Sequence, residues 1–168
     1  CYEFHQDGSQ RKCLVIPDGA FRNPMTVEQI QNQIVRMPLT GVVMDGSTVF
    51  NFAQKEVPIL VDSLTKMAET TKEDIDWFLF HQPNKFMLQK LAERIGVPFE
   101  KMPMDIVEKF GNSNSATIPT AITADLKEEM LNKESLCCLA GFGAGVAWAG
   151  IIMKMGNMDF CDTIISDL

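Results

Sequence analysis

Three polar segments of the sequence contain the groups that could do chemistry. His81 directly follows the apolar run at residues 77–80, Asn112 lies between Gly111 and Ser113, and glycines recur at positions 141, 143 and 145. An imidazole, a carboxamide and open backbone N–H groups can all donate hydrogen bonds to an oxygen that gains negative charge. Such a set suits acyl chemistry that passes through an enolate or a tetrahedral intermediate.

Each of these segments also has a purely structural interpretation. His81 could satisfy a hydrogen bond at a strand end, Asn112 could cap a helix, and the glycines could let two strands pass closely. A phosphate-binding loop is a poorer interpretation of residues 141–145, because they lack the lysine of a P-loop and precede a strand-like run. From the residue types alone, both interpretations stay open for each segment.

Alternating strands and helices must position these segments. Apolar runs predict strands at residues 12–16, 40–44, 77–80, 136–140 and 146–153. Apolar residues at three- and four-residue steps predict a long helix from Ser47 to Ala68, which Pro58 should kink or divide. A second helix should begin after Asn84 and end at Gly96. Residues 27–35 fit either a short helix or an extended segment.

The second polar segment, around Asn112, is expected to lead into another helix. Its small polar residues, 110–116, suit a tight loop and a helix N-cap. Pro119 is tolerated in a first helical turn, and the apolar spacing continues to about Asn132. The order of these elements predicts α/β layers in which His81 and the glycine turn lie at strand ends.

Composition limits the classes of function. A chain of 168 residues with 46% hydrophobic content can bury one core, so a single domain is expected. A formal net charge of −7 argues against general nucleic-acid binding. The five cysteines have no CxxC spacing, which argues against zinc and favours reduced thiols of an intracellular protein. Residues 136–153 are uncharged, but their glycines favour two buried strands over a membrane span.

The polar segments together resemble the β-ketoacyl-acyl carrier protein synthase III family of thiolase-fold condensing enzymes. Residues 76–84 (DWFLFHQPN) resemble the family's HQAN segment, and residues 111–119 (GNSNSATIP) resemble its GNTSAASIP segment. Residues 141–148 (GFGAGVAW) are similar to its AFGGGxxW turn. Two more segments, residues 5–9 and 44–53, also match, so the likeness runs in order from about Phe4 to Met153.

This resemblance implies the C-terminal half of a condensing enzyme. Such a thiolase-like half has three layers, with a five-stranded mixed sheet and helices on both faces. We expect one domain over residues 1–168, with strands and loops over 1–46, a core over 47–155 and an unassigned tail over 156–168. None of the five cysteines lies where a strand runs into a buried helix, so the nucleophile-bearing N-terminal half is expected to be absent and the isolated chain inactive.

The resemblance also implies the roles of individual residues. His81 and Asn112 would stabilise the enolate formed when malonyl-acyl carrier protein loses carbon dioxide, and the Ala144 amide would contribute to an oxyanion hole. The residues expected to line the substrate and pantetheine channel are Asn84, Gly46, Phe50 and Phe142. Acyl-CoA and malonyl-acyl carrier protein would be the substrates, with no cofactor or metal. The expected setting is cytoplasmic fatty acid biosynthesis by a homodimer of the full-length protein.

Departures from the family pattern keep other functions open. Pro83 and Ala144 replace an alanine and a glycine, and Phe86 lies where members usually have arginine. The helix that follows still has a basic face, which could dock an acidic carrier protein or could simply be solvated; its residues are Lys85, Lys90 and Arg94. The alternatives are a specialised acyltransferase of a secondary-metabolite, capsule or signalling pathway, and a non-catalytic carrier-binding or dimer-scaffolding module.

Overall fold

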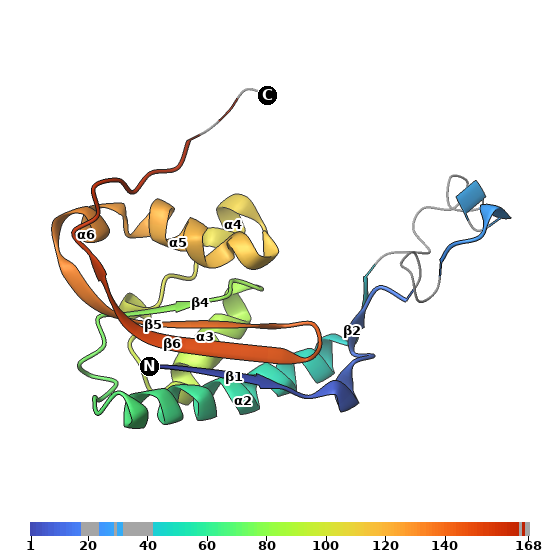
Figure 1. Cartoon of the computed structure of the whole chain (residues 1–168), viewed down its shortest axis with the longest axis horizontal. Coiled ribbons are helices and arrows are strands. Elements are labelled where there is room, and N and C mark those ends of the chain that lie inside the picture. The colour runs from blue at the N-terminus through green and yellow to red at the C-terminus, as the bar shows by residue number, and fades with distance from the viewer. Residues whose placement is uncertain (18–23, 29, 32–41, 165, 167–168) are drawn as a thin grey trace.

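The centre of the protein is a mixed β-sheet (Figure 1). A computed structural model describes residues 1–17, 24–28, 30–31, 42–164 and 166. Four strands form the sheet in the order β1-β6-β5-β4, and their bounds are β1 Tyr2–Gln6, β4 Trp77–Phe80, β5 Glu134–Gly143 and β6 Ala147–Gly156. The β4–β5 pair is parallel, and the other two pairs are antiparallel.

The expectation of a five-stranded sheet was wrong for the described residues. Two of the predicted strands, β2 (Leu14–Val15) and β3 (Val43–Met44), pair with each other in a separate two-stranded ribbon. Each contributes only two paired residues, so neither is long enough to extend the main sheet. The edge beside β6 is occupied by β1 instead, which the apolar pattern did not identify. The side chains of Tyr2 and Phe4 in this strand are 74% and 69% exposed.

Helices cover both faces of the sheet, as expected (Figure 1). On one face lie α2 (Gly46–Met67) and α3 (Lys85–Ile95), and on the other lie α4 (Ile106–Phe110), α5 (Thr117–Asp125) and α6 (Lys127–Asn132). Successive strand residues point to opposite faces. Phe78, Phe80 and Cys138 therefore join the core cluster under α2 and α3, whereas Leu79 and Cys137 join the cluster under α5 and α6. This alternation explains why β4 is apolar throughout and why β5 is apolar from Leu136 onward.

The predicted first helix forms, but Pro58 does not divide it. The carboxylate of Asp45 caps its start by accepting a hydrogen bond from the Thr48 backbone N–H at 3.1 Å. The helix α2 then continues through Pro58 to Met67. Buried Val57 and Val61 on either side of the proline anchor both halves to the same core, which holds the helix together across the missing backbone donor.

The second predicted helix has the expected ends, and the third is split. Asn84 caps α3 by accepting from the Met87 N–H at 2.8 Å, and Gly96 ends it at φ +81°. The helix predicted to reach Asn132 breaks at Leu126, where φ is −119° while the side chain stays buried. Most of the segment predicted at residues 27–35 lies outside the described residues.

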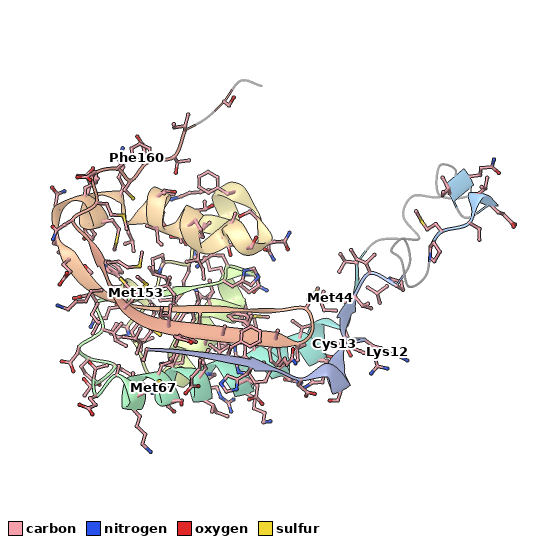
Figure 2. The ribbon with its side chains drawn as sticks, viewed as in Figure 1. Lys12, Cys13, Met44, Met67, Met153 and Phe160 are labelled. Carbon is pink, nitrogen blue, oxygen red and sulfur yellow. The ribbon has the colours of Figure 1, made fainter. Side chains whose placement is uncertain are left out.

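The tail, for which the sequence suggested no structure, packs along the α5–α6 layer. The Met158 N–H donates to the Met130 carbonyl at 2.9 Å, and Lys127 forms an ion pair with Asp162 at 3.0 Å. Cys161 is buried between these contacts, whereas Phe160 points outward (Figure 2). The first residues beyond β6 therefore belong to the folded unit.

Four of the five thiols are buried, as the sequence predicted for most of them. Only Cys1 is exposed, and no disulfide links the five. Burial raises the pKa of Cys137 to about 11 and that of Cys138 to about 12, so both remain protonated in the core. Within the described ranges, no cluster of side chains could hold a metal ion, and no helix is long and apolar enough to cross a membrane.

Candidate functional site

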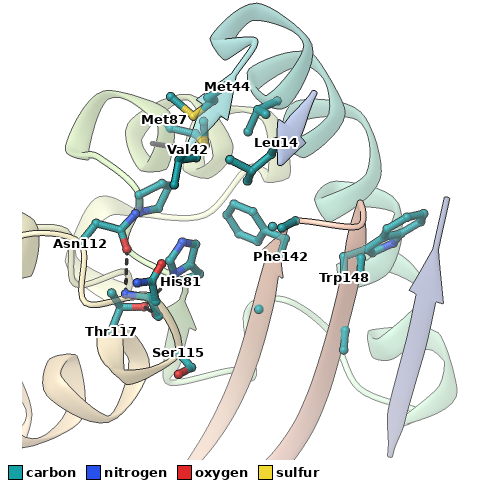
Figure 3. Close-up of a pocket in the computed structure, with 18 of the residues that line it drawn as sticks. Leu14, Val42, Met44, His81, Met87, Asn112, Ser115, Thr117, Phe142 and Trp148 are labelled. Atoms are coloured by element: carbon teal, nitrogen blue, oxygen red, sulfur yellow. Dashed lines mark hydrogen bonds between the residues drawn. The ribbon is translucent and has the colours of Figure 1, made fainter. Parts of the chain in front are cut away.

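The three polar segments meet in one cavity of about 790 Å³ (Figure 3). It lies where the parallel strands β4 and β5 end at the same edge of the sheet. His81 follows β4, Asn112 lies in the loop before α5, and Ala144 lies in the turn after β5; all three line the cavity. Apolar side chains form most of the remaining wall; they include Leu14, Met44, Val49, Met87, Phe142 and Trp148.

The end of β4 fixes the position of His81. Its backbone N–H donates to the Ala140 carbonyl at 2.8 Å, which continues the pairing with β5. Its ring packs edge-on against Phe142 with centroids 5.5 Å apart, and its Nδ1 lies 2.8 Å from the Thr117 Oγ1. Burial lowers the pKa of His81, and a hydrogen bond to the Asn114 backbone partly opposes this shift. The imidazole is therefore mainly neutral near pH 7.

The low pKa of His81 makes folding stability depend on pH. In the unfolded chain the ring has its ordinary pKa of about 6.5, so below that pH the unfolded state binds the extra proton more readily. This contribution to stability is fully present above pH 6.5 and is lost as the pH falls toward the folded pKa. We expect urea unfolding to give a smaller free energy at pH 5.5 than at pH 7.5, and a smaller difference for His81→Gln. An equal change in unfolding free energy between the two pH values in both proteins would contradict the assignment of this pH dependence to His81.

A tight turn presents the Asn112 carboxamide. The Asn114 N–H donates to the Asn112 Oδ1 at 3.0 Å, and both Gly111 and Asn114 have positive φ, at 69° and 52°. Because this contact uses the oxygen, the Nδ2 group is the end of the amide left to donate elsewhere. Asn112 is not the N-cap of α5, a position held by Ala116, so its structural role is confined to the turn.

The glycine turn presents the amide of Ala144. Val146 and Asp7 exchange two backbone hydrogen bonds, of 2.8 and 3.2 Å, which tie the turn to the end of β1. Gly145, with φ +139°, adopts a conformation that suits glycine. Within the described part of the chain, the Ala144 N–H has no hydrogen-bond acceptor. It is therefore available to a bound oxygen.

The other residues expected to line the channel divide into two groups. Phe142 lines the cavity, whereas Asn84, Gly46 and Phe50 are not among the residues that do. Asn84 uses its side chain to cap α3, Gly46 begins α2, and Phe50 stacks on Phe86 with ring centroids 5.9 Å apart. Their neighbours Val49, Pro83 and Met87 occupy the wall instead.

The basic face expected for carrier docking is partly neutralised. Lys85 lies 2.6 Å from Asp105 and 3.4 Å from Glu108, and Lys90 lies 2.7 Å from Glu93. These carboxylates reduce the positive field that Lys85 and Lys90 would otherwise present together with Arg94. Docking of an acidic carrier at these three residues remains a prediction.

Sequence reasoning missed one polar member of the site, Thr117. It is 1% exposed and lies beside the His81 ring, where its Oγ1 contacts Nδ1 (Figure 3). The available signal was a hydroxyl residue in the first turn of the helix that follows the Asn112 loop.

Comparisons with known proteins identify the family of the chain. The family model described as "3-Oxoacyl-[acyl-carrier-protein (ACP)] synthase III C terminal" matches residues 65–155. The β-ketoacyl-[acyl-carrier-protein] synthase III of Synechocystis sp. is 33% identical over 153 residues, which cover 91% of this chain and 45% of that protein.

Solved structures give the same result. The 3-oxoacyl-(acyl-carrier protein) synthase of Burkholderia xenovorans superposes with a TM-score of 0.85 at 34% identity, covering 97% of this chain and 46% of that one. The priming β-ketosynthase of the R1128 polyketide pathway superposes with a TM-score of 0.69 at 26% identity, over 92% of this chain and 44% of that one. The chain thus spans less than half the length of these relatives. Since the family model covers more than half of the chain, the chain belongs to the β-ketoacyl-acyl carrier protein synthase III family of thiolase-like enzymes and corresponds to its C-terminal part.

Proposed function

We propose that this chain supplies the histidine and asparagine side of a decarboxylative condensing site. The observation that carries the proposal is the convergence of His81, Asn112 and the Ala144 amide on one cavity with otherwise mostly apolar walls. Such walls exclude water and strengthen hydrogen bonds to a developing anion. The reaction would be that of a 3-oxoacyl-acyl carrier protein synthase III, which joins an acyl-CoA primer to malonyl-acyl carrier protein in fatty acid biosynthesis.

The first step would be decarboxylation. The carboxylate of the malonyl thioester leaves as carbon dioxide, and the electron pair of the broken carbon–carbon bond forms an enolate whose negative charge lies on the thioester oxygen. Asn112 would donate to this oxygen from Nδ2, and His81 from its ring. Both side chains line the same cavity, so one oxygen could receive both hydrogen bonds.

The second step would be carbon–carbon bond formation. The enolate carbon attacks the carbonyl carbon of an acyl group held as a thioester on cysteine, and the Ala144 N–H would stabilise the tetrahedral oxyanion. Collapse of that intermediate expels the cysteine thiolate and releases the 3-oxoacyl carrier. Splitting the reaction across a covalent acyl-enzyme replaces one difficult step with two easier ones.

The nucleophilic cysteine would come from outside this chain. Within the described residues, no cysteine lines the cavity. Cys137 and Cys138 are fully buried in β5, with pKa values raised to about 11 and about 12, and neither is suited to act as a thiolate. Asn112 and Ala144 are exposed, which leaves that side of the cavity open to a second half.

A condensation assay tests this proposal. Given acetyl-CoA and malonyl-acyl carrier protein, the protein as its gene encodes it should release carbon dioxide and form a 3-oxoacyl carrier. The isolated 168-residue chain should do neither. Product formed by the isolated chain would refute the missing-nucleophile account. No product from the encoded protein with any primer would favour a non-catalytic carrier-binding or scaffolding module.

A specialised acyltransferase is the second candidate. Its support is the likeness to the R1128 priming ketosynthase, together with the unusual Pro83, Phe86 and Ala144 around the site. Pro83 lines the cavity, and Phe86 extends an aromatic stack from Phe50 beside it. A panel of acyl-CoA primers separates the two candidates, because a preference for acetyl-CoA favours fatty acid initiation and a preference for a larger or functionalised primer favours the specialised reaction.

A further inference from the structure

The Thr117 hydroxyl is buried next to the His81 ring and has three polar neighbours. It lies 2.9 Å from the Asn114 carbonyl oxygen, 2.8 Å from the His81 Nδ1 and 3.3 Å from the Gln82 backbone nitrogen. Asn114 and Gln82 have fixed hydrogen-bonding roles, because a carbonyl only accepts and a backbone N–H only donates. The imidazole nitrogen is the one neighbour whose role is variable.

Counting hydrogens determines that role. A hydroxyl has one hydrogen to donate and two lone pairs that accept. The Asn114 carbonyl takes the hydrogen, and the Gln82 N–H takes one lone pair. Only the second lone pair is left for His81, so Nδ1 must carry a hydrogen and donate it. With Nδ1 bare instead, the hydroxyl hydrogen would turn to the ring and leave the Thr117 and Asn114 oxygens 2.9 Å apart with no hydrogen between them.

We propose that Thr117 is a positioning residue that holds the neutral imidazole of His81 as the Nδ1–H tautomer, so that Nε2 presents a lone pair in the ligand-free site. Thr117 lines the cavity beside His81 and comes from a different element, α5, whereas His81 follows β4. The contact therefore couples the Asn112 loop and its following helix to the ring.

The catalytic role of this tautomer rests on the proposed function. A neutral Nδ1–H ring cannot donate from Nε2 to an enolate oxygen. Either the Thr117 hydroxyl rotates from the Asn114 carbonyl to Nδ1 as the ring hydrogen moves to Nε2, or Nε2 takes up a second proton. In the first case the hydroxyl becomes the donor to Nδ1. In the second case, the positive charge of the ring is stabilised by two successive hydrogen bonds, from Nδ1–H to the Thr117 hydroxyl and from that hydroxyl to the Asn114 carbonyl. In both routes the same hydroxyl stays hydrogen-bonded to Nδ1 and keeps the ring in place.

The tautomer can be measured on this chain without any enzymatic activity. The chain has only two histidines, so a His5→Gln background leaves the His81 ring as the single imidazole signal. In ¹⁵N spectra at pH 8 we expect a pyrrole-like Nδ1 and a pyridine-like Nε2. Thr117→Val, which keeps the shape and removes the hydroxyl, should abolish this preference, and Thr117→Ser should retain it.

Two results would overturn the proposal. One is a pyrrole-like Nε2 in the chain with Thr117 intact, which needs no variant at position 117 and so stands even if the valine protein fails to fold. The other is an unchanged tautomer in a folded Thr117→Val chain. In the encoded protein, Thr117→Val also removes the hydrogen bond that orients the His81 ring, so it should lower kcat for malonyl decarboxylation about tenfold with little change in KM, and Thr117→Ser should restore it. A changed tautomer with unchanged decarboxylation supports the Thr117 assignment and counts against the proposed role of His81.

Discussion

Replacing His81 with alanine should lower malonyl decarboxylation by the encoded protein about 100- to 1,000-fold. Loss of one donor to a developing oxyanion typically costs about 2.7–4 kcal/mol of transition-state stabilisation, which corresponds to that factor. The site makes the estimate reasonable for His81, because its ring is partly buried and lies in the same cavity wall as Asn112. Release of labelled carbon dioxide from malonyl-acyl carrier protein measures the effect directly.

His5 provides a matched control for this experiment. It is the only other histidine, it stacks on Trp148 with ring centroids 5.3 Å apart, and it is not among the residues that line the cavity. His5→Ala should leave decarboxylation within about twofold of the parent rate, since it removes no donor to the oxyanion. Equal rates for His81→Ala and the parent protein would remove His81 from the mechanism and leave only a structural role.

Replacing Gly156 with alanine should lower the free energy of unfolding by about 3–5 kcal/mol. Gly156 ends β6 at φ +130°, and a methyl group there would lie 1.8 Å from the Lys133 carbonyl oxygen. The clash is with backbone, so a side-chain rotation cannot relieve it. Overpacking costs about 1–3 kcal/mol and an unfavourable φ costs a similar amount, and the two add here.

Urea unfolding of the isolated chain measures this loss, and Gly141 provides the comparison. Gly141 lies in the adjacent strand β5, and a methyl group built on it would meet no atom within 4 Å. Gly141→Ala should therefore change the free energy of unfolding by less than about 1 kcal/mol. Similar destabilisation by the two substitutions would show that the contact with Lys133 is not the cause.

Local signals predicted the elements that hold the site. The apolar run before His81 gave β4 with its bounds, because β4 is covered on both faces and tolerates no polar residue. Asn84 and Gly96 gave the ends of α3, since their caps depend on neighbouring residues alone. The β1 strand could not be predicted in this way. Its place in the sheet depends on pairing with β6, almost 150 residues away in the sequence.

The parts of the site that follow from strand direction could be predicted from the sequence. The contacts that depend on how separate elements pack together could not. His81 and the glycine turn follow parallel neighbours, so their convergence could be expected from the α/β pattern. The contact of Thr117 with His81 depends on how α5 packs over β4, which no local pattern encodes. Asn84 has a local role that the resemblance did not suggest. The resemblance placed it in the channel, but its side chain is engaged by the helix that it caps.

The distribution of thiols has a practical consequence. Cys13, Cys137, Cys138 and Cys161 are enclosed by the core, and Cys1 alone meets solvent. A maleimide or iodoacetamide probe would thus attach at a single defined place, the start of β1 at the sheet edge. The folded chain therefore has one site for thiol labelling, and reaction of the probe at further cysteines would report unfolding.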